Sequence, residues 1–418
     1  MNRTDANRLA FERLCAAEPV LVDIRPAIEV LPGMTPATVL TSGPPMPWER
    51  YVGGQRDAVI GGALFEGLAS DAEDAARKLE RGEITVDGCH DYGAVGSLAG
   101  IYTASMPVFV VENRHAGING FCNMYEGTDP RRLNYGVYDE GVRERLLFVQ
   151  DTIAPVLAEA VRAAGGIPLK PIMRRALHMG DELHSRNTAA SLLFTRELFP
   201  HLLRLDAGMR DAVDRTVAAL TEDHYFFLRL SMAAAKCTAD AAAGIDGSGV
   251  VTAMAFNCSN FAIRVGGLGD RWFLGPHASV DARLFDGHTE DEIAWMGGES
   301  VIAETIGLGG FAQAAAFPLQ QYQGGSQGGS AAAMVERNLQ LYAIAVGENP
   351  DYRIPYLGYR GTPTGIDIHR VVETGVLPVM DIGIAGRDGG QIGAGIVRAP
   401  IECFEAAVAA WEERYGAS

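Results

Sequence analysis

The most polar short stretch of the sequence, HMGDELHSRN (178–187), combines groups that could bind an anion and transfer a proton. It precedes an apolar helical pattern, and the N-terminus of a helix attracts anions. Arg186 would add a bidentate donor for carboxylate or phosphate, Asn187 a further amide, and His184 a group that titrates near neutral pH. Ser185 or Asn187 could instead act only as the helix N-cap, which leaves the other polar residues unexplained.

A second polar cluster lies in NCSNFAIRVGGLGDRWF (257–273), between apolar residues typical of a strand. Asn260 and Arg264 are four positions apart, so they lie on the same face of a regular strand. We expect Arg264 to bind an anionic group. Asn257 and Asn260 are expected to donate to a carbonyl or oxyanion.

The stretch GGESVIAETIGLGGFAQAAAF (297–317) places two carboxylates, Glu299 and Glu304, in an apolar helical pattern interrupted by glycines. Each glycine inside a helix costs about 1 kcal/mol relative to alanine. Gly309 and Gly310 therefore indicate close approach of the backbone to a ligand or to another helix. A buried carboxylate needs a partner such as Arg. The alternative is a tightly packed core helix with one capping Glu.

Two further groups of residues are candidates for a site. Arg114 follows the apolar strand pattern PVFVVEN, and the carboxyl ends of strands hold ligands in α/β sheets. Cys89 and His90 are adjacent, so on a strand they point to opposite faces and cannot act together. The glycines at 93–100 do not match the dinucleotide-binding fingerprint.

Composition limits the classes of partner. The 418 residues carry a net charge of −17, which argues against nucleic acid and against an anionic membrane surface. No uncharged apolar run reaches the roughly 18 residues of a membrane span. None of the six cysteines forms a CxxC pair, and Asp181, Glu182 and His184 alone are weak evidence for a metal. We expect a cytoplasmic protein with reduced thiols and no bound metal.

Hydrophobic periodicity predicts an α/β fold in three parts. Residues 1–140 alternate helical and strand patterns and form an N-terminal α/β domain. Residues 141–243 carry four helical patterns of period 3.6 and form a helical domain. Residues 244–418 form a Gly-rich α/β domain, with a helix expected near 298–316. This third domain should line most of the site, and the segment 181–187 should close one side.

Several long segments of the chain resemble the YlbE/YahG-like family. The segments are MGDELHSRN, SMPVFVVEN, AFNCSNFAIRVGGLGDRWF, GGESVIAETIGLGGFAQAAAFP, GPPMPWERYVGGQRDAVIGGALFEGLA and GTPTGIDIHRVVETGVLPVMDIGIA. Members are commonly encoded beside an FdrA-like protein, and one is linked to the oxamate carbamoyltransferase of allantoin degradation. The resemblance implies a subunit of a carbamoyltransferase of purine and nitrogen catabolism, which phosphorolyses a small anionic ureido acid such as oxalurate, with an FdrA-like partner subunit.

One segment departs from the family pattern. The turn after Cys89 reads CHDYGAVGSL, with Asp91 and Tyr92 in place of two His and Ser97 in place of Pro. This difference predicts a changed substrate or a lost contact.

For carbamoyl transfer we expect His184 to be the proton shuttle, Glu304 an orienting carboxylate and Asn257 an oxyanion donor. No cofactor is expected beyond phosphate or carbamoyl phosphate as co-substrate. The residues expected to bind substrate are Arg186, Arg264, Asn260, Asn187, Arg114, Gly309 and Gly310.

Two alternatives to a carbamoyltransferase stay open at this point. An amidohydrolase would use water in place of phosphate on a related ureide. A non-catalytic scaffold would bind a ligand while the FdrA-like partner carries out the chemistry. Gly- and Ala-rich helices pack closely, so a homodimer is also expected.

Overall fold

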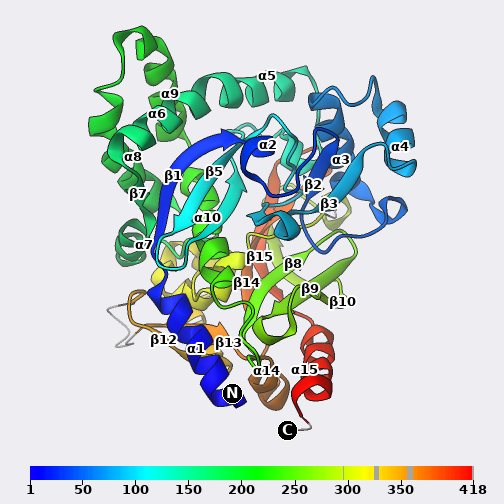
Figure 1. Ribbon diagram of the computed structural model, residues 1–418, viewed down its shortest axis with the longest axis vertical. Helices are drawn as coiled ribbons and strands as arrows, with labels where there is room; N and C mark the ends of the chain where they lie inside the picture. Colours follow the sequence, from blue (N-terminus) through cyan, green and yellow to red (C-terminus); the bar gives the residue numbers. More distant parts are fainter. Residues whose placement is uncertain (295, 324–328, 355–360, 417–418) are drawn as a thin grey trace.

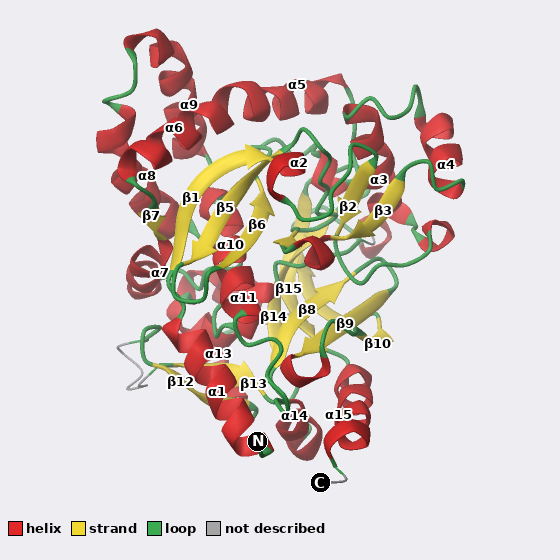
Figure 2. Ribbon diagram, viewed as in Figure 1, coloured by secondary structure: helices red, strands yellow, loops and turns green. Residues whose placement is uncertain are grey.

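The computed structural model describes residues 1–294, 296–323, 329–354 and 361–416, and it confirms the predicted mixed α/β class (Figure 1). Helices and strands are interleaved through the whole molecule, as Figure 2 shows. Among the described residues, no helix has both the length and the apolar character needed to cross a bilayer.

The helices are α1 (Arg3–Ala16), α2 (Ala27–Val30), α3 (Gly53–Phe65), α4 (Ala72–Glu80), α5 (Glu140–Phe148), α6 (Ala154–Ala164), α7 (Leu169–His178), α8 (Thr188–Leu202), α9 (Arg210–Glu222), α10 (Phe226–Asp240), α11 (Ile302–Thr305), α12 (Gln320–Gln323), α13 (Ala331–Leu341), α14 (Ile368–Thr374) and α15 (Ile401–Tyr415). A π-helical turn, Val149–Ile153, joins α5 to α6.

The strands are β1 (Pro19–Pro26), β2 (Thr38–Thr41), β3 (Thr85–Gly88), β4 (Ala94–Val95), β5 (Pro107–Asn113), β6 (Ile118–Asn123), β7 (Ile167–Pro168), β8 (Val251–Phe256), β9 (Asn260–Val265), β10 (Phe273–Pro276), β11 (Ser279–Leu284), β12 (Ala345–Asn349), β13 (Thr362–Ile366), β14 (Val379–Ala385) and β15 (Gln391–Arg398). They form sheets in the orders β4-β6-β5-β1-β7, β10-β9-β8, β11-β15-β14, β12-β13 and β2-β3.

Helix α10 is the central element beneath the five-stranded sheet. It packs against β5 and β6 and is buried on all sides from Phe226 to Ala239 (Figure 1). The surrounding core takes residues from all three predicted segments, among them Ala10, Leu157 and Ile302. A second core joins the β8–β10 and β11–β15–β14 sheets to α14 and α15. The division of the chain at residues 140 and 243 stays a prediction.

The helix expected near 298–316 does not form as one helix. The structure has only the four-residue α11 and a 3-10 turn over Gly309–Ala315. Gly307 and Gly309 adopt positive φ values of 85° and 55°, which end a right-handed helix. A Cβ at Gly310 would lie 1.9 Å from the Val379 carbonyl oxygen, so the glycine permits β14 to approach. Apolar periodicity alone cannot reveal these backbone conformations.

Glu299 ties together three loops that are distant in sequence. Its side chain is fully buried, and its two carboxyl oxygens accept hydrogen bonds from the Gly43 and Gly96 backbone N–H groups at 2.8 and 2.7 Å. Burial raises the pKa of this carboxyl to about 8. The hydrogen bond between Glu299 and Gly96 holds the neighbouring residues 97, 98, 297 and 298 together. These four residues form part of the wall of one cavity.

Replacing Glu299 by Ala should lower the free energy of unfolding by about 3 kcal/mol, because two buried N–H donors lose their acceptor. The same change at Glu405, on the exposed side of α15, is the control. Because the folded pKa is raised, the stabilisation by Glu299 is largest below pH 4.5 and is lost as pH rises through about 8. Urea unfolding at several pH values measures both effects; equal stability of the two variants would contradict this role.

Candidate functional site

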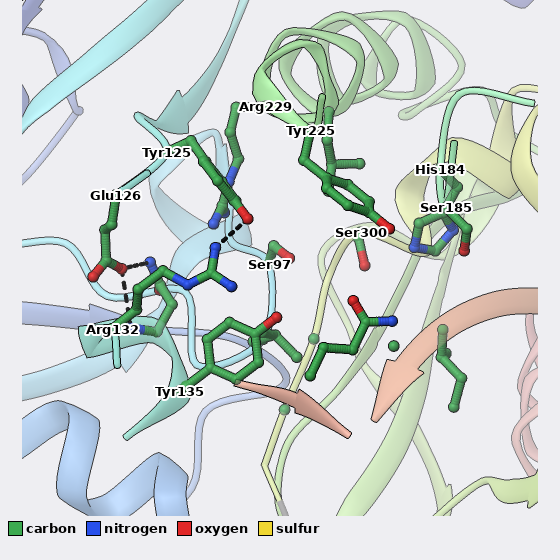
Figure 3. A pocket seen from close by; sticks show the side chains of 18 of the residues that line it. Ser97, Tyr125, Glu126, Arg132, Tyr135, His184, Ser185, Tyr225, Arg229 and Ser300 are labelled. Carbon is green, nitrogen blue, oxygen red and sulfur yellow. Dashed lines mark hydrogen bonds between the residues drawn. The ribbon is translucent and has the colours of Figure 1, made fainter. Parts of the chain in front are cut away.

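A cavity of about 80 Å³ lies where all three predicted segments meet, with room for several water-sized groups (Figure 3). We call it the central cavity. Apolar residues line it only in part, and its polar side chains come from elements distant in sequence. These polar residues are Ser97, Tyr125, Glu126, Arg132, Asn134, Tyr135, His184, Ser185, Tyr225, Arg229, Ser300 and Gln391.

Two buried arginines form one side of the central cavity. Arg132 and Arg229 are only 6% and 2% exposed. The Arg132 guanidinium donates to the Tyr125 hydroxyl and, at 2.9 Å, to the Gly127 carbonyl oxygen. Arg229 donates to the Asn123 amide oxygen at 3.0 Å. Both guanidiniums lie over the Tyr125 ring, 4.9 and 5.6 Å from its centroid.

Neither guanidinium forms an ion pair with a carboxylate of the described residues, and the Nε atom of each is buried without a partner there. Removing a charge from water costs several kcal/mol unless another group compensates it. Contact with an aromatic ring contributes only about 1–2 kcal/mol. The buried Asp223 carboxyl interacts electrostatically with both arginines but forms an ion pair with neither, so the two cations beside one cavity form a site suited to an anion.

The loop that carries Arg132 is held by Glu126. The Glu126 carboxylate accepts from the Leu133 and Asn134 backbone N–H groups at 2.7 and 3.0 Å, and from the Asn134 side-chain amide. These bonds occupy the carboxylate and fix the short turn Leu133–Tyr135, at whose start Arg132 lies. The acidic residue thus positions the loop without an ion pair to Arg132.

His184 lies on the other side of the cavity, on a tight turn before α8. The Glu182 carboxylate accepts from the His184 and Arg186 backbone N–H groups at 2.7 and 2.6 Å. Leu183 has a positive φ of 69°, which a branched residue rarely adopts. Figure 3 shows His184 opposite the two arginines, with the Tyr225 hydroxyl pointing toward it.

Glu304 fixes the His184 ring. The His184 Nδ1–H donates to Glu304 Oε1 at 2.8 Å, and the same oxygen accepts from the backbone N–H groups of Gly310 and Asp381. A Cβ at Gly309 would lie 2.2 Å from this oxygen, so only glycine fits. With Nδ1 bound, Nε2 is the ring nitrogen left for proton exchange with a ligand.

Two opposing effects act on the pKa of His184. Burial lowers it, and the Glu304 carboxylate raises it through its charge and its hydrogen bond; the net shift is upward. A buried imidazole held by a carboxylate is the arrangement that proton-transfer sites use to fix tautomer and orientation. The arrangement can accept a proton at Nε2 and return it.

The arginines expected from the sequence to bind substrate are paired with carboxylates outside the lining of the cavity. Arg186 bonds to Asp181, and Arg264 bonds to Asp91 while lying 4.2 Å above the Trp272 ring. His184 and Glu304 come together as expected, but only His184 lines the cavity, and neither Arg186 nor Arg264 does.

The remaining expected site residues make hydrogen bonds within the protein, some of them to segments distant in sequence. Asn257 donates to the Pro44 carbonyl and accepts from the Asn260 backbone, and Asn260 donates to the Gly275 carbonyl. Asn187 donates to the His184 carbonyl at 2.8 Å, so it supports the turn. Arg114 is exposed and bonds to the Gly165 carbonyl. Gly309 and Gly310 surround the Glu304 carboxylate.

Cys89 and His90 are both buried and do not line the central cavity. The Cys89 thiol donates to the Thr41 and Gly100 carbonyl oxygens, and burial raises its pKa well above the ordinary value. The thiolate needed for a nucleophile is therefore disfavoured at neutral pH. Burial lowers the pKa of His90, whose ring packs edge-on against Trp272.

Sequence reasoning missed the anion side of the cavity. Arg229 lies in the otherwise apolar run FFLRLSMAAA. A single cation on a helix that is buried on all sides requires a partner that offsets its charge, and that requirement was the available signal. The loop MYEGTDPRRLNYG (124–136) combines aromatic and basic residues, but its Gly and Pro make it resemble an ordinary connection.

One family model and three known proteins match this chain. The family model of the oxamate carbamoyltransferase subunit AllG matches residues 84–300. The uncharacterized protein YahG of Escherichia coli is 41% identical over 98% of this chain and 86% of its own length. The oxamate carbamoyltransferase subunit AllG of the same organism is 39% identical over 98% of both chains. A conserved protein of unknown function from Enterococcus faecalis superposes with a TM-score of 0.94, at 38% identity over 98% of both chains.

Changing Glu304 to Gln should lower the pKa of His184. The carboxylate charge that raises this pKa is removed, whereas the burial that lowers it is unchanged. Titration of the histidine ring signals by NMR measures the change, with His184→Asn to assign the signal. Glu405→Gln on the exposed side of α15 is the matched control and should leave the titration unchanged. An unchanged or higher pKa in Glu304→Gln would contradict the coupling.

Proposed function

The chain belongs to the family of the oxamate carbamoyltransferase subunit AllG, and we propose that it is a subunit of a carbamoyltransferase acting on a small ureido acid. The observation that supports this most directly is the pair of buried guanidiniums, Arg132 and Arg229, without carboxylate partners among the described residues. Carbamoyl transfer with phosphate involves two anions, a carboxylate and a phosphate, and guanidinium groups bind both.

The proposed reaction is the phosphorolysis of a ureido acid such as oxalurate. A phosphate oxygen forms a bond to the ureido carbonyl carbon, giving a tetrahedral oxyanion. The bond from this carbon to the inner nitrogen then breaks, which releases carbamoyl phosphate and, from oxalurate, oxamate. The proton lost by phosphate is the proton gained by the leaving nitrogen, so the step needs a group that carries it from one to the other.

His184 is the residue suited to that transfer. Its Nδ1–H is held by Glu304 at 2.8 Å, so Nε2 can take the phosphate proton and return it to the leaving nitrogen. Arg132 and Arg229 would hold the anionic groups, and the Ser97, Ser300 and Tyr225 hydroxyls lie between the two sides of the cavity (Figure 3). Hydroxyl donors placed there can stabilise the oxyanion.

A partner subunit belongs to the proposal. The relative is named a subunit of its enzyme, so we expect this chain to act with an FdrA-like partner. Activity is therefore best measured both for the isolated chain and after the partner is added.

Arg132→Ala and Arg229→Ala should each weaken the binding of phosphate or oxamate at least tenfold, because a charge-assisted hydrogen bond to a buried anion is lost. Isothermal titration calorimetry on the purified chain measures this. Arg204→Ala, on an exposed loop after α8, is the matched control and should bind as the unmodified chain does. Tight binding that neither cavity variant reduces would contradict the anion site.

His184→Asn should reduce formation of carbamoyl phosphate from oxalurate and phosphate by roughly 100-fold, the usual contribution of a proton-transfer group, with anion binding retained. Release of ammonia without a requirement for phosphate would instead identify an amidohydrolase. Activity of the complex that does not change in His184→Asn would indicate that this chain only binds a ligand.

A further inference from the structure

A second cavity adjoins the central cavity and has the opposite chemistry. Its volume is also about 80 Å³, and apolar side chains form most of its wall. We call it the apolar chamber; its residues include Val280, Ile293, Met296, Ile384 and Val397. Val280 comes from β11, Ile384 from β14 and Val397 from β15, while Ile293 and Met296 lie in the chain between β11 and α11.

The two cavities have a common border. Leu98, Phe256, Ile382 and the glycines at 297 and 383 line both of them. A Cβ at Gly297 would lie 2.6 Å from the Phe256 carbonyl oxygen, and one at Gly383 would lie 3.1 Å from the Gln391 side chain, so both glycines permit close packing at this border. A ligand in the central cavity therefore contacts residues that also line the apolar chamber.

The backbone at this border is strained. Leu98 has a positive φ of 54°, a conformation that a residue with a branched side chain rarely adopts. Strained backbone conformations persist only where the surrounding structure enforces them. They cluster at sites where a protein binds a ligand. The Leu98 side chain forms part of the wall of both cavities, which a glycine could not do.

We propose that the ligand of this chain has an anionic group at Arg132 and Arg229 and an apolar substituent in the apolar chamber. The inference rests on the proposed function and specifies its substrate class: a ureido acid with an aliphatic or aromatic side chain, in other words an N-carbamoyl derivative of an apolar amino acid. Oxalurate has no hydrocarbon group and would leave the chamber without a partner.

The test is a homologous series of ligands on the purified full chain. Calorimetric titration compares the N-carbamoyl derivatives of glycine, alanine, valine and leucine. Affinity should rise about threefold to fourfold for each methylene or methyl group buried, so the leucine derivative should bind on the order of 100-fold tighter than the glycine derivative. Affinity that stays level or falls along the series would overturn the proposal.

Two substitutions in the chamber separate this effect from general loss of folding. Ala294→Leu would fill the chamber, since Ala294 lines it but not the central cavity, and Val280→Asp would place a charge in its partly exposed wall. Each should reduce binding of the leucine derivative at least tenfold and leave binding of the glycine derivative within twofold. Ala409→Leu, on the exposed side of α15, is the control and should preserve the whole series.

The outcomes distinguish failure of the inference from failure of the proposed function. If the glycine derivative binds in an Arg132-dependent way but longer derivatives gain nothing, only the apolar chamber is overturned. If Arg132→Ala binds the series as tightly as the unmodified chain does, the proposed anion site is wrong as well. The same follows if no member of the series binds. If both chamber variants still bind the leucine derivative more tightly than the glycine derivative, the apolar chamber does not bind the side chain and the inference is wrong.

Discussion

The Glu304 carboxylate is buried where three distant segments of the chain meet. One of its oxygens accepts from the His184 ring, from the Gly310 backbone and from the Asp381 backbone on β14. These hydrogen bonds replace the hydration of this oxygen, while the other carboxyl oxygen, Oε2, is buried without a hydrogen-bond partner among the described residues. The fit requires glycine at 309, where a Cβ would lie 2.2 Å from the carboxylate oxygen. The direction of the imidazole, and the β14 edge beside the cavity, both depend on this contact.

Much of the fold follows from short-range sequence patterns. The apolar run PVFVVEN is a strand (β5), and the helical patterns of the central segment correspond to α5, α6, α8, α9 and α10. The same reasoning failed at 298–316, where an apolar pattern of helical period contains glycines of positive φ. Periodicity reports which faces are apolar, but it does not report backbone conformations that only glycine can adopt.

The site was only half predictable for a related reason. His184 and Glu304 are unusual for their surroundings and could be selected by residue type alone. Whether an arginine is free to bind a ligand depends on its long-range partner: Arg264 bonds to Asp91, 173 positions away. The expectation that the third segment lines most of the site was also incomplete, because Arg132 and Arg229 come from the other two.

The position of Arg229 has a consequence for the amount of protein a cell can maintain. Its helix, α10, is part of the largest core, and Arg229 forms no ion pair among the described residues, so the cost of burying its charge falls on the whole native state rather than on a surface loop. An anion that binds only the native state stabilises it by mass action, by about 2.7 kcal/mol at a ligand concentration 100 times the dissociation constant. A higher ligand concentration would then leave a smaller fraction of the protein unfolded and open to proteolysis. The amount of protein in the cell would rise with the amount of its ligand.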